Sequence, residues 1–142
     1  ITVHGGHLKG IDIDASNIPD LVPALAAVAS FADGVTHITG AQRLRYKESD
    51  RLQTVAAALK ALGANITMEE DGLTIIGRSY LDGGICNAAG DHRIAMMAAV
   101  AAQGCKNIVT IVGEEAVNKS YPHFFEDYES LGGKTEQSEE VS

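Results

Sequence analysis

The chain has 142 residues, a formal net charge of -8 and 45% hydrophobic residues, with few aromatics and no Trp. This length suits one ordinary domain or two small repeated units, packed by small and aliphatic side chains as in layered helix-on-sheet folds. The acidic balance argues against a nucleic-acid partner, because a duplex binder needs a broad basic face.

The sequence shows no signal peptide, and its longest apolar run, residues 94–102, is too short to cross a bilayer. Cys86 and Cys105 lack the spacing of metal ligands, so we expect two buried free thiols. These features predict a cytoplasmic protein that does not associate with a membrane. We also expect it to be a monomer. Because the chain opens on a strand-like segment without an initiator Met, we expect it to be part of a longer polypeptide.

In chain order, alternation of apolar residues first predicts a strand at residues 8–14. A helix is expected at residues 21–31, with Pro23 tolerated in its first turn. The β-branched residues 35–39 then predict a second strand.

Ser49 is the expected cap of the next helix, which ends at Gly63. The apolar stripe of this helix consists of Leu52, Val55, Leu59 and Leu62. Asp71-Gly72, between residues 65–69 and 73–76, predicts a hairpin.

The second half predicts a strand at residues 84–86, a helix from the cap Asp91 to about Gln103, and a strand at 108–112. Ser120 is expected to cap a last helix, which carries Pro122 in its first turn and stops at Gly132-Gly133. The expected stripes of these two helices are Ile94, Met97, Ala98 and Ala101, and Phe124, Tyr128 and Leu131.

The two halves resemble each other at a fixed offset. Residues 26–30 match residues 98–102, and Lys47 falls on Lys119 at the same offset of 72. Such similarity indicates a duplicated β-α-β-α-β-β unit, at about residues 8–77 and 82–134, with weak final strands in the second copy. The alternative is an α/β protein with chance similarity between Ala-rich helices. The polar tail, residues 135–142, is expected to be disordered.

Charged residues concentrate at two predicted helix starts. Residues 43–51 hold four cations and two carboxylates, and Asp91-His92-Arg93 opens a later helix. The start of a helix offers unpaired N–H groups and a positive dipole end, so added cations make an anion site. Cations in the first turn of a helix are otherwise electrostatically unfavourable, so Arg51 and Arg93 favour ligand binding over solvation. We therefore expect a pocket for small anions.

Several motifs in order are similar to those of the 5-enolpyruvylshikimate-3-phosphate synthase family. They are residues 11–14 and 18–20, Lys47 to Arg51, Gly90 to Met96, and Lys119 to Pro122 with Phe124 and Phe125. The resemblance covers about residues 10–133. It implies an inside-out barrel fold of two lobes, each with three β-α-β-α-β-β units. The chain would be the C-terminal part of one lobe, with the N-terminal part missing, and is not expected to turn over alone.

The resemblance also implies an activity. The enolpyruvyl group of phosphoenolpyruvate moves to the 5-hydroxyl of shikimate 3-phosphate, phosphate is released, and neither a metal nor an organic cofactor takes part. Such an enzyme serves aromatic amino-acid biosynthesis and is a target of glyphosate. Asp12 and Asp14 share one face of their strand, but no third ligand follows at useful spacing, so we expect no metal.

By the same resemblance, Asp20 is the base beside the 5-hydroxyl and Glu48 donates a proton to the methylene carbon. Lys47 would bridge the two substrates and polarise the hydroxyl. From the sequence alone, Asp20 also reads as a helix cap and Glu48 as a first-turn carboxylate favoured by the helix dipole. A neutral Glu48 would require burial that offsets the neighbouring Lys47 and Arg51.

Arg51 and Arg93 would grip the carboxylate of phosphoenolpyruvate in planar forks. His92 would hydrogen-bond nearby, with a structural histidine as the alternative. Lys119 would contact phosphate or carboxylate, although alone it reads as a surface lysine. Arg43 receives no role, because the family uses several residue types there.

Two competing functions remain. One is the related transferase that acts on UDP-N-acetylglucosamine, whose fold and chemistry are alike. The other is a non-catalytic anion-binding domain that reuses the fold, since a fold alone does not settle function. Asp20 and Glu48 weigh against the second, because a binding module gains nothing from carboxylates directed at anionic ligands.

Overall fold

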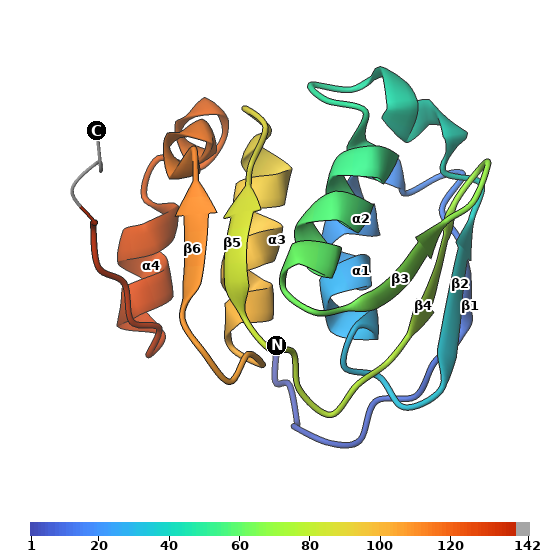
Figure 1. Cartoon of the computed structure of the whole chain (residues 1–142), viewed down its shortest axis with the longest axis horizontal. Coiled ribbons are helices and arrows are strands. Elements are labelled where there is room, and N and C mark those ends of the chain that lie inside the picture. The colour runs from blue at the N-terminus through green and yellow to red at the C-terminus, as the bar shows by residue number, and fades with distance from the viewer. Residues whose placement is uncertain (139–142) are drawn as a thin grey trace.

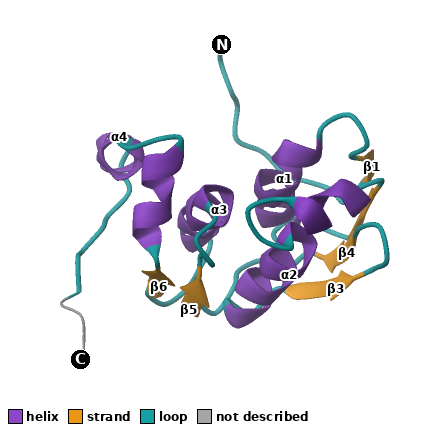
Figure 2. Cartoon of the chain, turned by 90° about the horizontal axis from the view of Figure 1, so that it is seen from above, coloured by secondary structure: helices purple, strands orange, loops and turns teal. Residues whose placement is uncertain are grey.

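The computed structural model describes residues 1–138 and has a mixed α/β architecture. Three helices, α1 (Val22–Ala29), α2 (Arg51–Ala61) and α3 (His92–Ala102), pack side by side, and the strands border them (Figures 1 and 2). A fourth helix, α4 (Phe124–Ser130), lies beyond α3 and is fastened to it by the Tyr128 hydroxyl, which donates to the Ala99 carbonyl at 2.8 Å.

The first half forms a four-stranded sheet in the order β1-β2-β4-β3. Its strands are β1 (Asp12–Asp14), β2 (Val35–Thr39), β3 (Asn65–Met68) and β4 (Leu73–Ile76). β1 runs parallel to β2, with Ile13 opposite Ile38, whereas β2 and β3 both pair antiparallel with β4. The hairpin predicted around Asp71-Gly72 is confirmed by the β3–β4 pairing.

The second half repeats this order of elements but stops earlier. β5 (Gly84–Asn87) and β6 (Val109–Val112) form a parallel pair and flank α3 in sequence, as β1 and β2 flank α1. A 3-10 helix precedes α2 and another precedes α4, namely η2 (Gln42–Tyr46) and η3 (Glu114–Lys119). The final two strands expected in the second copy are absent from the described residues, because no strand follows α4 up to residue 138.

The core lies where the faces of α1, α2 and α3 meet the sheets. The stripes predicted on α2 and α3 are confirmed, since all eight of their residues are buried. α2 ends as predicted at Gly63, whose φ of +100° only glycine adopts without strain. The Gly63 N–H bonds the Lys60 carbonyl at 2.9 Å, and the Ala64 N–H bonds the Leu59 carbonyl at 2.9 Å.

Two predicted caps are wrong. Asp50, not Ser49, caps α2, with its carboxylate accepting from the Gln53 N–H at 3.3 Å. Ser120 ends η3, so Pro122 precedes α4 rather than lying in its first turn. The chain turns there because the Ser120 and Tyr121 N–H groups both bond the Val117 carbonyl.

Several boundaries also differ from the predictions. Lys9 pairs with Asp33 in an isolated bridge, and continuous pairing to β2 begins only at Asp12, so β1 covers only the end of the predicted strand. Between the bridge and β1 lies Gly10, where a Cβ would lie 2.3 Å from the Val35 carbonyl oxygen. A 3-10 helix, η1 (Pro19–Leu21), replaces the expected start of the first helix. Leu131, predicted to be on the buried stripe of α4, is exposed.

Both cysteines are free: Cys86 is buried, and Cys105 is only partly buried, so the expectation of two buried thiols holds for one. Residues 135–138 form neither helix nor strand, and residues 139–142 of the predicted tail lie outside the described residues. Among residues 1–138, no helix is long and apolar enough to cross a membrane. That same part of the chain holds no cluster of three or more His, Cys, Asp or Glu side chains suited to a metal ion.

Candidate functional site

The charged motifs of the sequence meet at one end of the helix layer. Figure 1 shows α1, α2 and α3 beginning at the same end of the molecule. η1 supplies Asp20, the segment before and at the start of α2 supplies residues 47–51, and the start of α3 supplies residues 91–93. Ion pairs of Arg51 and Arg93 join these three segments. The expectation that distant motifs form one charged cluster is therefore met by this part of the chain.

Asp20 lies at the centre of the cluster and faces three cations. Its Oδ1 is 3.1 Å from Arg51 Nη1 and 3.7 Å from Lys47 Nζ, and its Oδ2 is 3.5 Å from Arg93 Nη2. Arg93 also donates from Nη1 to the Asp20 backbone carbonyl at 3.4 Å. About half of the Asp20 side chain remains exposed, so the carboxylate faces solvent as well as cations.

The Arg51 guanidinium bonds one buried carboxylate and two exposed ones. Its side chain is only 1% exposed. Nε and Nη2 bond the two oxygens of Asp91 at 2.9 and 3.1 Å. The outer edge of the guanidinium bonds Asp20 through Nη1 at 3.1 Å and Glu48 through Nη2 at 2.5 Å. Two parallel hydrogen bonds to one carboxylate fix the plane of the guanidinium.

Asp91 couples the two helix starts. It caps α3 by accepting from the Arg93 N–H at 3.0 Å, and it also accepts from Ser49 Oγ at 2.9 Å. Burial by itself raises the pKa of this carboxyl. Hydrogen bonds from Arg51 and Ser49, the charge of Arg51 and the Arg93 N–H together outweigh burial and lower the pKa below its usual 3.8.

Glu48 lies at the rim of the cluster. Its side chain is 42% exposed, and its carboxylate bonds Arg51. The burial that the sequence argument required for a neutral Glu48 is thus not provided by residues 1–138 in this arrangement. For Glu48 to donate a proton, another anion would have to replace it at Arg51, and solvent would have to be excluded from the Glu48 carboxyl.

Lys47 lies between a 3-10 helix that the sequence did not predict and the start of α2. It ends η2, with an extended backbone conformation. Lys47 and Arg51 nevertheless reach the same oxygen of Asp20. The 3-10 helix was missed because its sequence, Gln42 to Tyr46, lacks the periodicity of an apolar face and holds a single buried side chain, Leu44.

Two further predicted residues flank the cluster at the start of α3. Lys119 Nζ donates to the Gly90 carbonyl at 2.7 Å, in the turn just before the Asp91 cap. His92 is largely buried, and its Nδ1 has no hydrogen-bond partner among residues 1–138. A buried ring nitrogen without a hydrogen-bond partner is uncommon in folded proteins.

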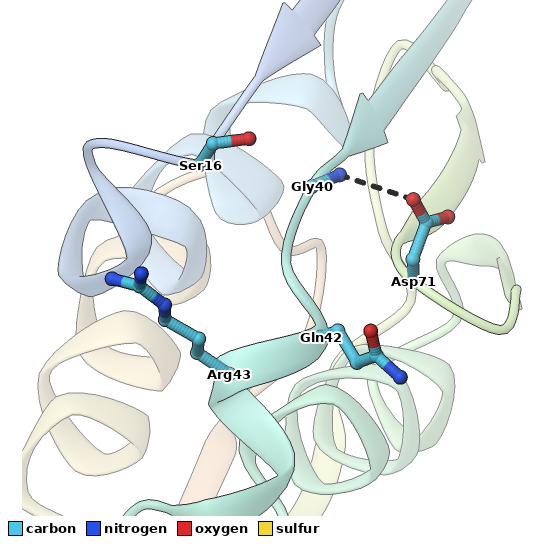
Figure 3. A pocket seen from close by; sticks show the side chains of 5 residues that line it. All are labelled: Ser16, Gly40, Gln42, Arg43 and Asp71. Atoms are coloured by element: carbon cyan, nitrogen blue, oxygen red, sulfur yellow. Dashed lines mark hydrogen bonds between the residues drawn. The ribbon is translucent and has the colours of Figure 1, made fainter.

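A polar pocket of about 270 Å³ opens beside the segment that leads into η2. It is lined by Ser16, Gly40, Gln42, Arg43 and Asp71 (Figure 3). Arg43, which received no role from the sequence, extends away from Asp71 in this view. The Asp71 carboxylate instead bonds the Gly40 N–H at 3.3 Å.

Sequence reasoning placed Asp91 in the second charged cluster and as a helix cap, and it assigned Ser49 only as a cap. It did not predict that either residue would bond across the two helix starts. Nothing in the sequence paired Asp91 with Arg51, because the two lie 40 residues apart in the chain.

Comparisons with solved structures define the class of fold. The chain superimposes on EPSP synthase from Acinetobacter baumannii with a TM-score of 0.85 and 38% identity, covering 94% of this chain and 32% of that one. It also matches the enolpyruvyl transferase NikO from Streptomyces tendae with a TM-score of 0.71 over 92% of this chain and 30% of that one; at 22% identity this supports the fold alone. The fold is part of an enolpyruvyl transferase lobe.

The sequence comparisons narrow this class to a family. The family model described as EPSP synthase (3-phosphoshikimate 1-carboxyvinyltransferase) matches residues 1–128. The enzyme of that name from Clostridium acetobutylicum is 52% identical over 89% of this chain and 30% of its own length. The one from Methanocella arvoryzae is 48% identical over 96% of this chain and 32% of its own length. The chain belongs to the EPSP synthase family and spans about a third of the length of these curated relatives.

Proposed function

We propose that this chain supplies one half of the active site of a 3-phosphoshikimate 1-carboxyvinyltransferase. The enzyme would transfer the enolpyruvyl group of phosphoenolpyruvate to the 5-hydroxyl of shikimate 3-phosphate and release phosphate. The rest of the polypeptide would supply the other half. We further propose that the whole protein is cytoplasmic and monomeric and acts on small molecules, without a nucleic-acid or membrane partner.

The observation that carries this proposal is the convergence on Asp20. Three cations from two distant segments, Lys47, Arg51 and Arg93, approach one half-exposed carboxylate. Both proposed substrates are anions, so a cluster of cations suits them, and membership of the family supports their choice. A carboxylate placed among cations that would bind an anion suits proton transfer better than simple anion binding, which it would oppose.

The addition requires a base at the attacking hydroxyl and an acid at the methylene carbon. Asp20 would accept the proton of the 5-hydroxyl as its oxygen attacks C2 of phosphoenolpyruvate. Glu48 would deliver a proton to the methylene carbon, which becomes a methyl group. The resulting tetrahedral intermediate would then return a methyl proton to Glu48 while phosphate leaves with the proton held by Asp20, which restores the carbon–carbon double bond and both side chains. Lys47 would stabilise the phosphate and the developing charge on the hydroxyl oxygen.

The geometry of Arg51 supports a carboxylate site on its outer edge. Nη1 and Nη2 each have a hydrogen bond to a different exposed carboxylate, Asp20 and Glu48. A substrate carboxylate that forms two parallel bonds to this edge would replace both. Asp91 would keep hold of the inner edge throughout. The displacement would release Glu48 from its cation at the moment when it is needed as an acid.

The experiment uses the full-length polypeptide that contains this chain. Glu48→Gln keeps size and hydrogen bonding but removes the proton-donating group, so kcat should fall by about 10²–10⁴. Glu126→Gln is the matched control, since Glu126 is an exposed carboxylate paired with His123 on α4. Its kcat should stay within about twofold of the parent.

Unchanged turnover in Glu48→Gln would contradict the acid role. Lack of transfer by the parent enzyme, with either shikimate 3-phosphate or UDP-N-acetylglucosamine as acceptor, would contradict the transferase proposal as a whole. Transfer to the UDP-sugar alone would favour the related transferase instead.

A further inference from the structure

The turn between β3 and β4, residues 69–72, packs against the segment that leads to Lys47. The Ala41 N–H donates to the Asp71 carbonyl at 2.7 Å, and the Gly40 N–H donates to the Asp71 carboxylate at 3.3 Å (Figure 3). One turn residue therefore receives two successive backbone N–H groups at the point where the chain leaves β2.

Arg45 contacts the same turn from further along the segment. Its Nη2 donates to the Glu69 carbonyl at 3.2 Å and to the Glu70 carbonyl at 3.0 Å, and its Nε donates to the Glu70 carbonyl at 3.3 Å. The remaining nitrogen, Nη1, reaches the Asp50 carboxylate at 3.4 Å. Because Asp50 caps α2, Arg45 joins the hairpin turn to the start of that helix.

The turn itself is held firmly against the sheet. A Cβ on Gly72 would lie 1.7 Å from the Ile38 carbonyl oxygen, so the turn backbone passes directly over the end of β2. The Glu69 N–H closes the turn by bonding the Gly72 carbonyl at 2.8 Å. A turn fixed in this way is a rigid support for whatever it contacts.

The supported segment has little stability of its own. Residues 42–46 form a 3-10 helix, which has poorer hydrogen-bond geometry than an α-helix, and only Leu44 within it is buried. Lys47 follows at its end, and Glu48 comes next. The positions of these two side chains therefore depend on contacts outside the segment.

We propose that the β3–β4 turn is a positioning device for Lys47 and Glu48, with Asp71 and Arg45 as the positioning residues. This proposal rests on the proposed function, because it assigns the turn a part in the transfer reaction. Neither residue needs to touch substrate. Asp71 acts through the Gly40 and Ala41 backbone, and Arg45 acts through the turn carbonyls and the cap of α2.

A competing role for Asp71 is direct contact with a ligand, since it also lines the pocket beside Arg43. Asp71→Asn separates the two roles. Its side-chain oxygen still accepts from the Gly40 N–H, whereas its charge is gone. A positioning residue tolerates this change, but a residue that contacts a ligand through its charge does not.

The kinetic test compares three variants of the full-length polypeptide. Asp71→Ala should lower kcat by about 10- to 100-fold, because small displacements of catalytic groups are costly, while KM changes by less than about threefold. Asp71→Asn should restore kcat to within about threefold. Glu70→Ala is the matched control: it removes a neighbouring exposed carboxylate, and Glu70 joins the Arg45 contacts through its carbonyl alone. Its kcat should match the parent.

Amide hydrogen exchange provides a readout that does not require activity. Asp71→Ala and Arg45→Lys should each raise exchange over residues 40–47 by about tenfold, with α3 and β5 unchanged. If Asp71→Ala does not fold, Arg45→Lys still tests the proposal, since lysine lacks the fork that spans two carbonyls.

The outcomes separate this proposal from the proposed function. One outcome is raised exchange over residues 40–47 in the variants of a parent protein that has no transferase activity. It would show that the turn holds this segment in place, but it would contradict a part of the turn in catalysis. Normal exchange and normal kcat in both Asp71→Ala and Arg45→Lys would overturn the positioning proposal and leave the transferase proposal standing. Equal losses of kcat in Asp71→Ala and Asp71→Asn would assign Asp71 to direct ligand contact.

Discussion

The starts of α2 and α3 look alike in sequence but differ in the structure. Each has an Asp cap followed by an Arg in the first turn, Asp50 with Arg51 and Asp91 with Arg93. Arg51 is 1% exposed and bonded to three carboxylates, whereas Arg93 is 36% exposed and, among residues 1–138, its side chain bonds only Asp20. The same residue type in the first turn of two helices therefore has two environments.

Burial distinguishes two roles of arginine in one anion site, a structural role and a ligand-binding role. Arg51 forms part of the fixed framework, since Asp91 holds its inner edge and only its outer edge faces the rim. Arg93 keeps most of its donors for solvent or a ligand. Changes that break the Arg51–Asp91 pair should therefore affect stability first, and changes at Arg93 should affect ligand binding first.

The largest effect on stability is expected from Asp91→Ala. The substitution leaves the Arg51 guanidinium buried without its inner partner, and loss of one member of a buried pair costs about 3–5 kcal/mol. We expect about 3 kcal/mol, at the lower end, because Glu48 and Asp20 still pair with Arg51. Chemical denaturation of parent and variant would measure this difference in the free energy of unfolding.

Asp82→Ala is the matched control for that measurement. Asp82 pairs with Arg78 on the surface, with side chains 61% and 37% exposed, and such pairs contribute about 0–1 kcal/mol. Equal losses of stability in the two variants would contradict the framework role of Asp91.

A smaller effect, on binding rather than stability, is expected from Arg93→Ala. In the full-length polypeptide the KM for phosphoenolpyruvate should rise by about 10- to 100-fold through loss of charge-assisted hydrogen bonds. The free energy of unfolding should change by less than about 1 kcal/mol, as for other exposed pairs. Arg78→Ala, which removes an equally exposed Arg, should leave this KM unaltered. A large loss of stability with normal KM would reverse the assignments of Arg51 and Arg93.

The smallest effect is a pH dependence confined to acid conditions. The pKa of Asp91 is lowered below 3.8 in the folded chain, so its stabilisation is complete above 3.8 and is lost as the pH falls through the lower folded value. The stability difference between the parent and Asp91→Asn should narrow by about 1.4 kcal/mol per pH unit below about 3.8. A difference that stays constant from pH 7 to pH 3 would show that the charge of Asp91 is not part of the framework.

Much of the fold could be predicted from local patterns. The stripes of α2 and α3, the stop at Gly63 and the β3–β4 hairpin each depend on residues within a few positions of one another. Ser49 failed as a cap because its hydroxyl bonds Asp91 at a distant helix start. Ser120 failed for a local reason, because its N–H bonds the Val117 carbonyl and ends η3.

The residues of the site could also be predicted from the sequence, but the contacts between them could not. Charge at helix starts identified Lys47, Arg51 and Arg93, and the structure brings all three to Asp20. Nothing in the sequence indicated that Arg51 would be buried, because burial depends on how α2 and α3 pack. The role of the hairpin turn was invisible for the same reason, since Asp71 and Gly40 meet only in the folded chain.

The most direct test of the central claim is an amide-shift titration of the full-length polypeptide with shikimate 3-phosphate and phosphoenolpyruvate, with sulfate and UDP-N-acetylglucosamine as controls. We expect the two substrates to cause amide shifts that exceed those caused by sulfate at Asp20, at residues 47–51, at residues 91–93 and at Lys119. Equal shifts with sulfate would reduce the cluster to a general anion site. Shifts elsewhere, with these residues unchanged, would contradict the assignment of this cluster as half of the active site.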